Sequence, residues 1–190
     1  SGDSKIVWQQ NINQLLIDLN SNPKAITFIG GPKNGVDYYF LRLFLKSQNI
    51  DPAGINYLET TSGAQLVSKL SGNNSLIAIS SNGHFISGAN AGKTRVLGLA
   101  SPDRLTWIKG KTLISQGIDL IFGNRFGVFA PANLPQGDFD NLLRSLEILH
   151  NSKTWKKILA ENYWSDDFMY SSDYKVFIET QIESLQKEFS

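Results

Sequence analysis

The spacing of apolar side chains predicts alternating helices and strands over the first half of the chain. Ile12, Leu15, Leu16 and Leu19 follow the pattern of an amphipathic helix, which Pro23 ends because proline cannot continue the hydrogen-bond ladder. Further helices are expected over residues 36–47, 64–70 and 85–91, and strands over residues 25–29, 55–58, 76–79 and 93–100. Strands that alternate with helices indicate βαβ units and a mostly parallel sheet, so the predicted fold class is α/β.

A different pattern follows residue 100. Residues 101–112 are polar and turn-like, and residues 125–131 have the composition of a strand that Pro131 ends. Three helices with apolar residues at helical spacing are expected in the rest of the chain: residues 138–151, 155–163 and 174–189, the last of them capped by residues 171–173. This change separates an α/β part from a C-terminal part that is mainly helical.

Three loops rich in small and polar residues follow predicted strands, at residues 30–35, 59–62 and 80–82. The first opens directly onto a helix, where main-chain N–H groups without intrahelical partners and the positive end of the helix dipole suit an anion. Ligands of parallel sheets bind outside the carboxyl ends of the strands, which is where all three loops lie. An ordinary βα turn would have the same composition as any one of these loops. The residues expected to bind a small organic anion are Gly30, Gly31, Lys33, Asn34, Gly35, Thr60, Thr61, Ser80 and Ser81.

The composition excludes several classes of function. The 190 residues have a formal net charge of +1, so the sequence shows no electrostatic footprint for nucleic acid. It contains no apolar run of the about 18 residues that a membrane-spanning helix needs. The chain has no cysteine, which excludes disulfides, cysteine-ligated zinc and thiol nucleophiles.

Motifs for catalysis and metal binding are also absent from the sequence. His84 and His150 belong to no metal-ligand spacing, and neither a nucleophile elbow nor a phosphate-binding loop of the NTPase type is found. His150 closes a predicted helix, where it would interact with the helix dipole. His84 borders the loop at residues 80–82, where either a ligand contact or a solvated turn residue is compatible with the pattern. We therefore predict no catalytic residue, no metal and no cofactor.

Three stretches of the chain resemble, in order, motifs of one known family. Residues 22–30 (NPKAITFIG) are similar to the family pattern NPGKLTYGS, and residues 89–101 (ANAGKTRVLGLAS) to IKAGKLRALAVTS. Residues 127–135 (GVFAPANLP) are similar to GLFAPAGTP. The family is that of the tripartite tricarboxylate transporter receptors, the TctC or Bug periplasmic solute-binding proteins. The region from Trp8 to Phe44 resembles the start of the second lobe of these receptors, with Tyr38 where a histidine is usual.

The resemblance implies a lobe of the type II periplasmic-binding-protein kind. Residues 5–122 would form the second lobe, an α/β ligand-binding domain, and residues 123–190, a strand plus helices, would belong to the first lobe. Family members carry the opening strand of the first lobe and a PFPPGG carboxylate loop further upstream. Either that part and a signal peptide precede this sequence in the natural protein, which Ser1-Gly2 favours because it looks like a remnant of cloning, or the chain is a one-lobe relative with a different function.

The resemblance also implies a function. The chain would be a non-enzymatic, periplasmic receptor that binds a small organic carboxylate, such as a di- or tricarboxylate, and delivers it to the subunits of a membrane transporter. Where the family often has an Asp-Asn pair this chain has Ser80 and Ser81, so hydroxyl groups replace a carboxylate. Apolar faces within residues 126–189 could drive formation of a homodimer. The alternative is a sensor or protein-interaction domain that keeps the fold without a role in transport.

Overall fold

The computed structural model describes residues 11–72 and 76–189. Trp8 and the first residues of the predicted lobe at 5–122 lie outside the described residues. The chain divides into two compact units, residues 1–127 and residues 128–190. The assignment of these units to two lobes of a receptor stays a prediction.

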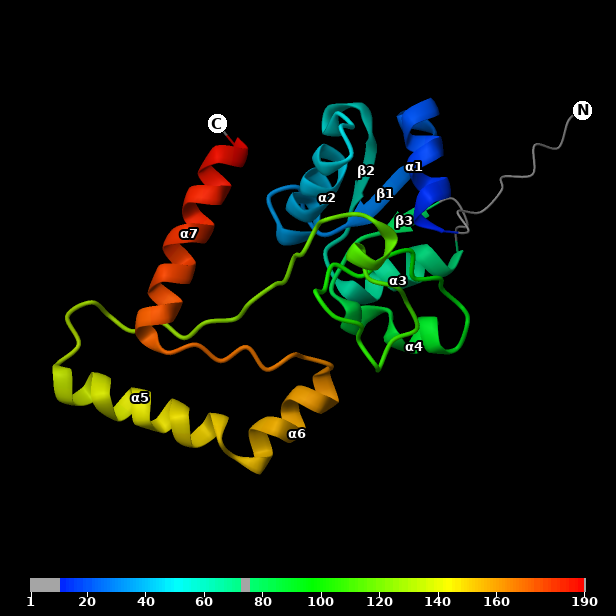
Figure 1. Ribbon diagram of the computed structural model, residues 1–190. Coiled ribbons are helices and arrows are strands. Elements are labelled where there is room, and N and C mark those ends of the chain that lie inside the picture. Colours follow the sequence, from blue (N-terminus) through cyan, green and yellow to red (C-terminus); the bar gives the residue numbers. More distant parts are fainter. Residues whose placement is uncertain (1–10, 73–75, 190) are drawn as a thin grey trace, which may run out of the picture. The chain divides into compact units, whose positions relative to one another are not determined.

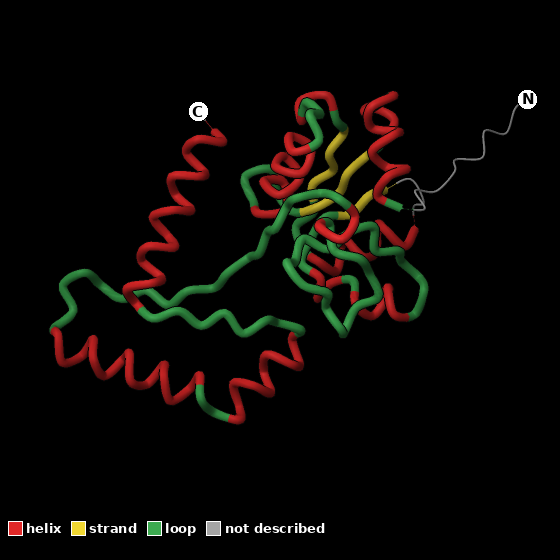
Figure 2. Tube along the Cα trace, viewed as in Figure 1, coloured by secondary structure: helices red, strands yellow, loops and turns green. Residues whose placement is uncertain are grey.

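A three-stranded parallel sheet is the centre of the first unit. Strands β1 (Thr27–Gly30), β2 (Asn56–Glu59) and β3 (Leu76–Ala78) are arranged in the order β2-β1-β3, with the strands shown in yellow in Figure 2. In this register Phe28 lies opposite Tyr57 on one side and Ile77 on the other. The sheet confirms the expected α/β class, and its parallel strands bring their carboxyl ends to one edge.

Helices of the first unit form where the apolar spacing predicts them. They are α1 (Ile12–Ser21), α2 (Val36–Ser47), α3 (Gly63–Gly72) and α4 (Ile86–Asn90), and Figure 1 shows α1 and α2 beside the strands. The Ser62 hydroxyl accepts from the Gln65 amide at 3.2 Å and thereby caps the start of α3. The main core is built largely of side chains from α1, α2 and β1, among them Leu15, Leu19, Phe28, Leu41 and Leu45.

Residues 93–100 do not form the strand that the sequence predicts. Leu99 makes an isolated parallel bridge with Thr112, while the Leu97 carbonyl accepts from the side chain of Gln116 at 3.0 Å. A strand needs a neighbour that satisfies its main-chain groups in sequence along the ladder. Here a side chain satisfies one of them, so an apolar, β-branched segment remains a loop that packs against the core.

In the second unit, the described residues 128–189 form three helices, α5 (Gln136–His150), α6 (Lys153–Asn162) and α7 (Ser171–Phe189). These helices confirm the three predicted from periodicity. The prediction of a strand at residues 125–131 is wrong, because this segment is an irregular loop. Phe126 and Phe129 are 77% and 74% exposed, so the apolar side chains that suggested a strand lie on the surface. Among the described residues, no helix is long and apolar enough to cross a membrane.

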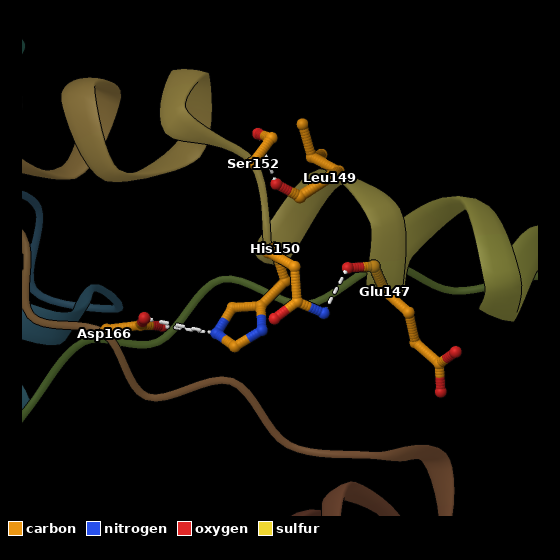
Figure 3. Close-up of polar contacts among 6 residues, drawn as sticks. Glu147, Leu149, His150, Ser152 and Asp166 are labelled. Atoms are coloured by element: carbon orange, nitrogen blue, oxygen red, sulfur yellow. Dashed lines mark hydrogen bonds and ion pairs between the residues drawn. The ribbon is translucent and has the colours of Figure 1, made fainter.

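A cluster of polar and aromatic contacts follows the end of α5. The His150 Nε2 atom lies 3.1 Å from both carboxylate oxygens of Asp166 (Figure 3). The imidazole also stacks on Phe168, with 4.2 Å between the ring centroids. The Ser152 hydroxyl donates to the Leu149 carbonyl at 2.6 Å and accepts from the Trp155 amide at 3.0 Å, so it joins the end of α5 to the start of α6. His150 therefore lies at the end of a helix, as expected for an interaction with the helix dipole, and it also contacts the carboxylate of Asp166.

Candidate functional site

A cavity of about 120 Å³ lies at the carboxyl ends of the parallel strands. Its lining comes from the loops after β1, β2 and β3 and from the first turns of α2 and α3: Gly31, Pro32, Asp37, Thr60, Thr61, Ser62, Gly63, Leu66, Ser80 and His84. The structure thus brings together four of the predicted residues, Gly31, Thr60, Thr61 and Ser80. The other five, Gly30, Lys33, Asn34, Gly35 and Ser81, are not part of this lining.

The main-chain amides of the glycine-rich loop are paired within the protein. Gly31 N–H donates to Asp37 Oδ2 at 2.9 Å, and Lys33 N–H donates to Glu59 Oε2 at 3.0 Å. Gly35 N–H donates to the Pro32 carbonyl at 2.8 Å. The expectation of unpartnered amides at these three positions is therefore wrong. Two carboxylates of the chain already take the positions that an incoming anion was expected to fill.

Asp37 is the principal residue of the site that sequence reasoning missed. It lies in the first turn of α2, where a carboxylate interacts favourably with the positive end of the helix dipole. The signal was present in the sequence as an acidic residue two positions after Gly35, the N-cap of α2. Its side chain both closes the loop through Gly31 and lines the cavity. This position therefore adds an acceptor to a wall where donors were expected.

Tyr57 supports the same wall from β2. Its hydroxyl donates to the Gly31 carbonyl at 2.7 Å, which requires the neutral phenol. Burial raises the pKa of Tyr57 well above its usual value, and the negative charges of Asp37 and Glu59 raise it further. The phenol therefore remains a donor at neutral pH, and the two carboxylates add negative charge at this edge.

The two threonines differ in what they can offer a ligand. Thr60 is buried, and both its amide and its hydroxyl lie 2.8 Å from the Gly30 carbonyl, to which they donate. With its proton used in this way, the Thr60 hydroxyl can only accept from a ligand. The Thr61 hydroxyl lies 3.4 Å from Gln65 Oε1, which is long for an O–H···O bond, and it is exposed. Thr61 is thus the better donor for a carboxylate.

Ser80 and His84 form a second polar pair in the lining. Ser80 Oγ lies 2.9 Å from His84 Nδ1, across the 3-10 turn Asn82–His84 that follows β3. The imidazole lies against Gly63, and a Cβ at that position would collide with the ring, with His84 Cδ2 2.5 Å away. Glycine at the start of α3 therefore makes room for the imidazole. His84 lines the cavity and is also an exposed residue of a turn, so both alternatives for it stay open.

The arrangement is chemically two-sided. Asp37 and Thr60 present acceptors, whereas Thr61, Ser80 and His84 carry hydroxyl or ring N–H groups that can donate. Within residues 11–72 and 76–189, no group of three or more histidine, aspartate and glutamate side chains could hold a metal ion. Such a lining can hold a small polar molecule by hydrogen bonds at the mouth of the sheet.

Comparison with known proteins identifies the fold. No protein-family model matches the chain, and no curated protein matches it. Among solved structures, R. palustris Rpa4515 with adipate superposes with a TM-score of 0.79 at 16% identity, covering 98% of this chain and 61% of that one. A TctC solute-binding protein from Polaromonas, without ligand, gives 0.71 at 13% identity, covering 95% of this chain and 61% of that one. MatC from Rhodopseudomonas palustris, with bound malate, gives 0.65 at 13% identity, covering 80% and 52%.

These similarities confirm the resemblance at the level of the fold. The chain has the α/β architecture of TctC solute-binding proteins. It spans between 52% and 61% of the length of the three solved chains that it matches. The structures that it resembles include a solute-binding protein and two proteins solved with small carboxylates.

Proposed function

We propose that the first unit supplies one wall of a binding site for small organic carboxylates in a non-enzymatic solute receptor. One observation carries this proposal: loops that follow three parallel strands place Thr61, Ser80 and His84 around a single cavity at the mouth of the sheet. Donors that converge from separate elements on one concavity are typical of ligand sites. Support also comes from the fold, which is shared with proteins solved with adipate and with malate.

The ligand carboxylate would be held by side chains rather than by loop amides. Ser80, Thr61 and His84 can donate to it, while Gly31 and Lys33 already donate to Asp37 and Glu59. Gly30 and Gly35 would shape the loop, and the side chains of Lys33, Asn34 and Ser81 would contact a ligand only when it extends beyond the cavity. In this proposal the charge of Lys33 attracts the anion, and the cavity orients it.

The size of the cavity suggests that this wall acts together with another. Sites that enclose a ligand measure about 300–1,000 Å³, compared with about 120 Å³ here. A second wall that closes over the ligand would bury it and would supply the conformational switch read by a partner. The partner we propose is a membrane transporter of the tripartite tricarboxylate type, served by a periplasmic receptor; a homodimer would use apolar residues of 126–189.

Titration calorimetry with succinate, malate, adipate and citrate, carried out on the full-length protein that carries both proposed walls, tests the proposal. At least one should bind, and Ser80→Ala should weaken that binding about tenfold to a hundredfold, since a hydrogen bond to a charged group contributes about 1.5–3 kcal/mol. Ser68→Ala, an exposed serine of α3 outside the cavity, is the matched control and should bind as the unaltered chain does. Absence of binding by all four acids, or equal binding by the Ser80→Ala variant, would contradict the proposal.

A further inference from the structure

The Asp37 carboxylate is a hydrogen-bond acceptor in the cavity lining, and it affects which carboxylate ligands can bind. Asp37 Oδ2 accepts from the Gly31 amide at 2.9 Å, and the side chain also lines the cavity. A carboxylate has two oxygens with about four lone-pair sites, so one such bond leaves capacity for a ligand donor. The hydrogen bond from the Gly31 N–H fixes the position of this acceptor, because Gly31 follows directly on the buried strand β1.

Glu59 adds to the negative charge at the same edge. It follows Leu58 at the end of β2 and accepts from the Lys33 amide at 3.0 Å. The raised pKa of Tyr57, which has both Asp37 and Glu59 among its causes, reflects the proximity of these charges. A ligand that carried only carboxylates would therefore place one acceptor against another, and like charges disfavour this.

We infer that the site selects a carboxylate that also carries a hydrogen-bond donor beside the carboxyl group, either an ammonium or a hydroxyl. This inference rests on the proposed function. Asp37 accepts from the ligand donor, and Ser80 and His84 face the ligand carboxylate with their own donors. An ammonium makes a charge-assisted bond to Asp37, which is shorter and stronger than the bond from a hydroxyl.

The His84–Ser80 pair has a proton arrangement that suits this ligand. When the Ser80 hydroxyl donates to His84 Nδ1, the neutral ring carries its proton on Nε2, the ring atom nearest to Gly63 in the cavity lining, and this N–H is the donor of the pair. When the ring donates from Nδ1 instead, the Ser80 proton becomes available to the ligand. In either arrangement the pair offers one donor to the carboxylate, while Asp37 remains an acceptor.

The size of the discrimination follows from the partial exposure of the site. A fully enclosed site that must satisfy a buried polar group rejects a ligand lacking the matching group by about 10⁴-fold or more. Asp37 is only half-buried, so water can replace the missing donor. We therefore expect a preference of about tenfold to a hundredfold.

Three ligands that share a four-carbon dicarboxylate skeleton test the inference: succinate, malate and aspartate carry hydrogen, hydroxyl and ammonium at the same carbon. Calorimetry should show malate or aspartate binding at least about tenfold more tightly than succinate. In Asp37→Asn the preference for aspartate over succinate should fall to about threefold or less, since the amide keeps an acceptor but loses the charge. Asp51→Asn, which makes the same charge change at the exposed turn Pro52–Gly54, should leave the preference intact.

The outcomes separate this inference from the proposed function. Succinate binding as tightly as both other ligands would overturn the inference while leaving a carboxylate receptor in place. An unchanged preference in a folded Asp37→Asn variant would overturn it as well. If no ligand of the series and no acid of the larger panel binds, both proposals fail. Thermal melting of the variant shows whether it folds, and if it does not, the ranking by the unaltered chain decides.

Discussion

Replacement of Gly30 by alanine tests how tightly the mouth of the sheet is packed. A Cβ at this position would lie 2.5 Å from the Tyr57 hydroxyl, 2.9 Å from the Ile79 carbonyl oxygen and 3.1 Å from Asp37 Cβ. The Ile79 oxygen belongs to the main chain, which cannot rotate away as a flexible side chain can. The strand itself must shift, and the Tyr57 hydroxyl must leave its 2.7 Å bond to the Gly31 carbonyl.

The expected magnitude has two parts. Overpacking of a well-packed site costs about 1–3 kcal/mol. Loss of the Tyr57 hydrogen bond adds about 1 kcal/mol. Gly30→Ala should therefore lower the free energy of unfolding of the first unit by about 2–4 kcal/mol, a large share of the about 5–15 kcal/mol that a domain typically has.

Urea unfolding measures this loss, with amide hydrogen exchange in β1, β2 and β3 as the readout specific to the first unit. Gly123→Ala is the matched control, because a Cβ there meets nothing within 4 Å. It should change the free energy of unfolding by less than about 1 kcal/mol. A Gly30→Ala variant as stable as this control would refute the packing described at the cavity and, with it, the rigid placement of Asp37.

Two further predictions concern a titrating group and a helix cap. Because folding raises the pKa of Tyr57, the folded state keeps a proton that the unfolded chain loses above about pH 10, and the free energy of unfolding should fall as the pH rises beyond that value. Tyr57→Phe should reduce this dependence on pH, measured by urea unfolding across alkaline pH. An unchanged dependence would contradict the burial assigned to Tyr57. Because one group can account for at most one proton, the difference in slope should not exceed about 1.4 kcal/mol per pH unit. Ser152→Ala should destabilise the second unit by about 0.5–2 kcal/mol, measured by thermal melting, because it removes the acceptor for the Trp155 amide. Ser145→Ala, which replaces an exposed serine of α5, is the control. Equal melting temperatures of the two variants would argue against the cap.

Helices were predictable because their signals lie within single segments. The bounds of α2 match the expected residues 36–47, since no glycine or proline interrupts that run and Gly35 precedes it. The three C-terminal helices follow from apolar spacing in the same way. The two strands that failed, at residues 93–100 and 125–131, have the right composition, but a strand also needs a neighbouring chain segment to receive its hydrogen bonds.

The candidate site was predictable in place but not in chemistry. Parallel strands bring their carboxyl ends together, so the loops containing Gly31, Thr61 and Ser80 meet as expected. The partners of the amides were not predictable, since Lys33 bonds Glu59 across 26 positions of sequence. His84 is at the cavity because Gly63, on another element, has no side chain to exclude it.

The sequence by itself determined the α/β class, the helices and the edge of the sheet where a ligand would bind, because periodicity and chain direction are local properties. Tertiary structure alone decided the electrostatic character of that edge. Asp37 and Glu59 accept hydrogen bonds from main-chain amides that local reasoning assigns to an anion. Which side chains reach these amides depends on how the chain folds in space. A main-chain donor has one proton to give, so the first carboxylate to reach it determines what remains for a ligand.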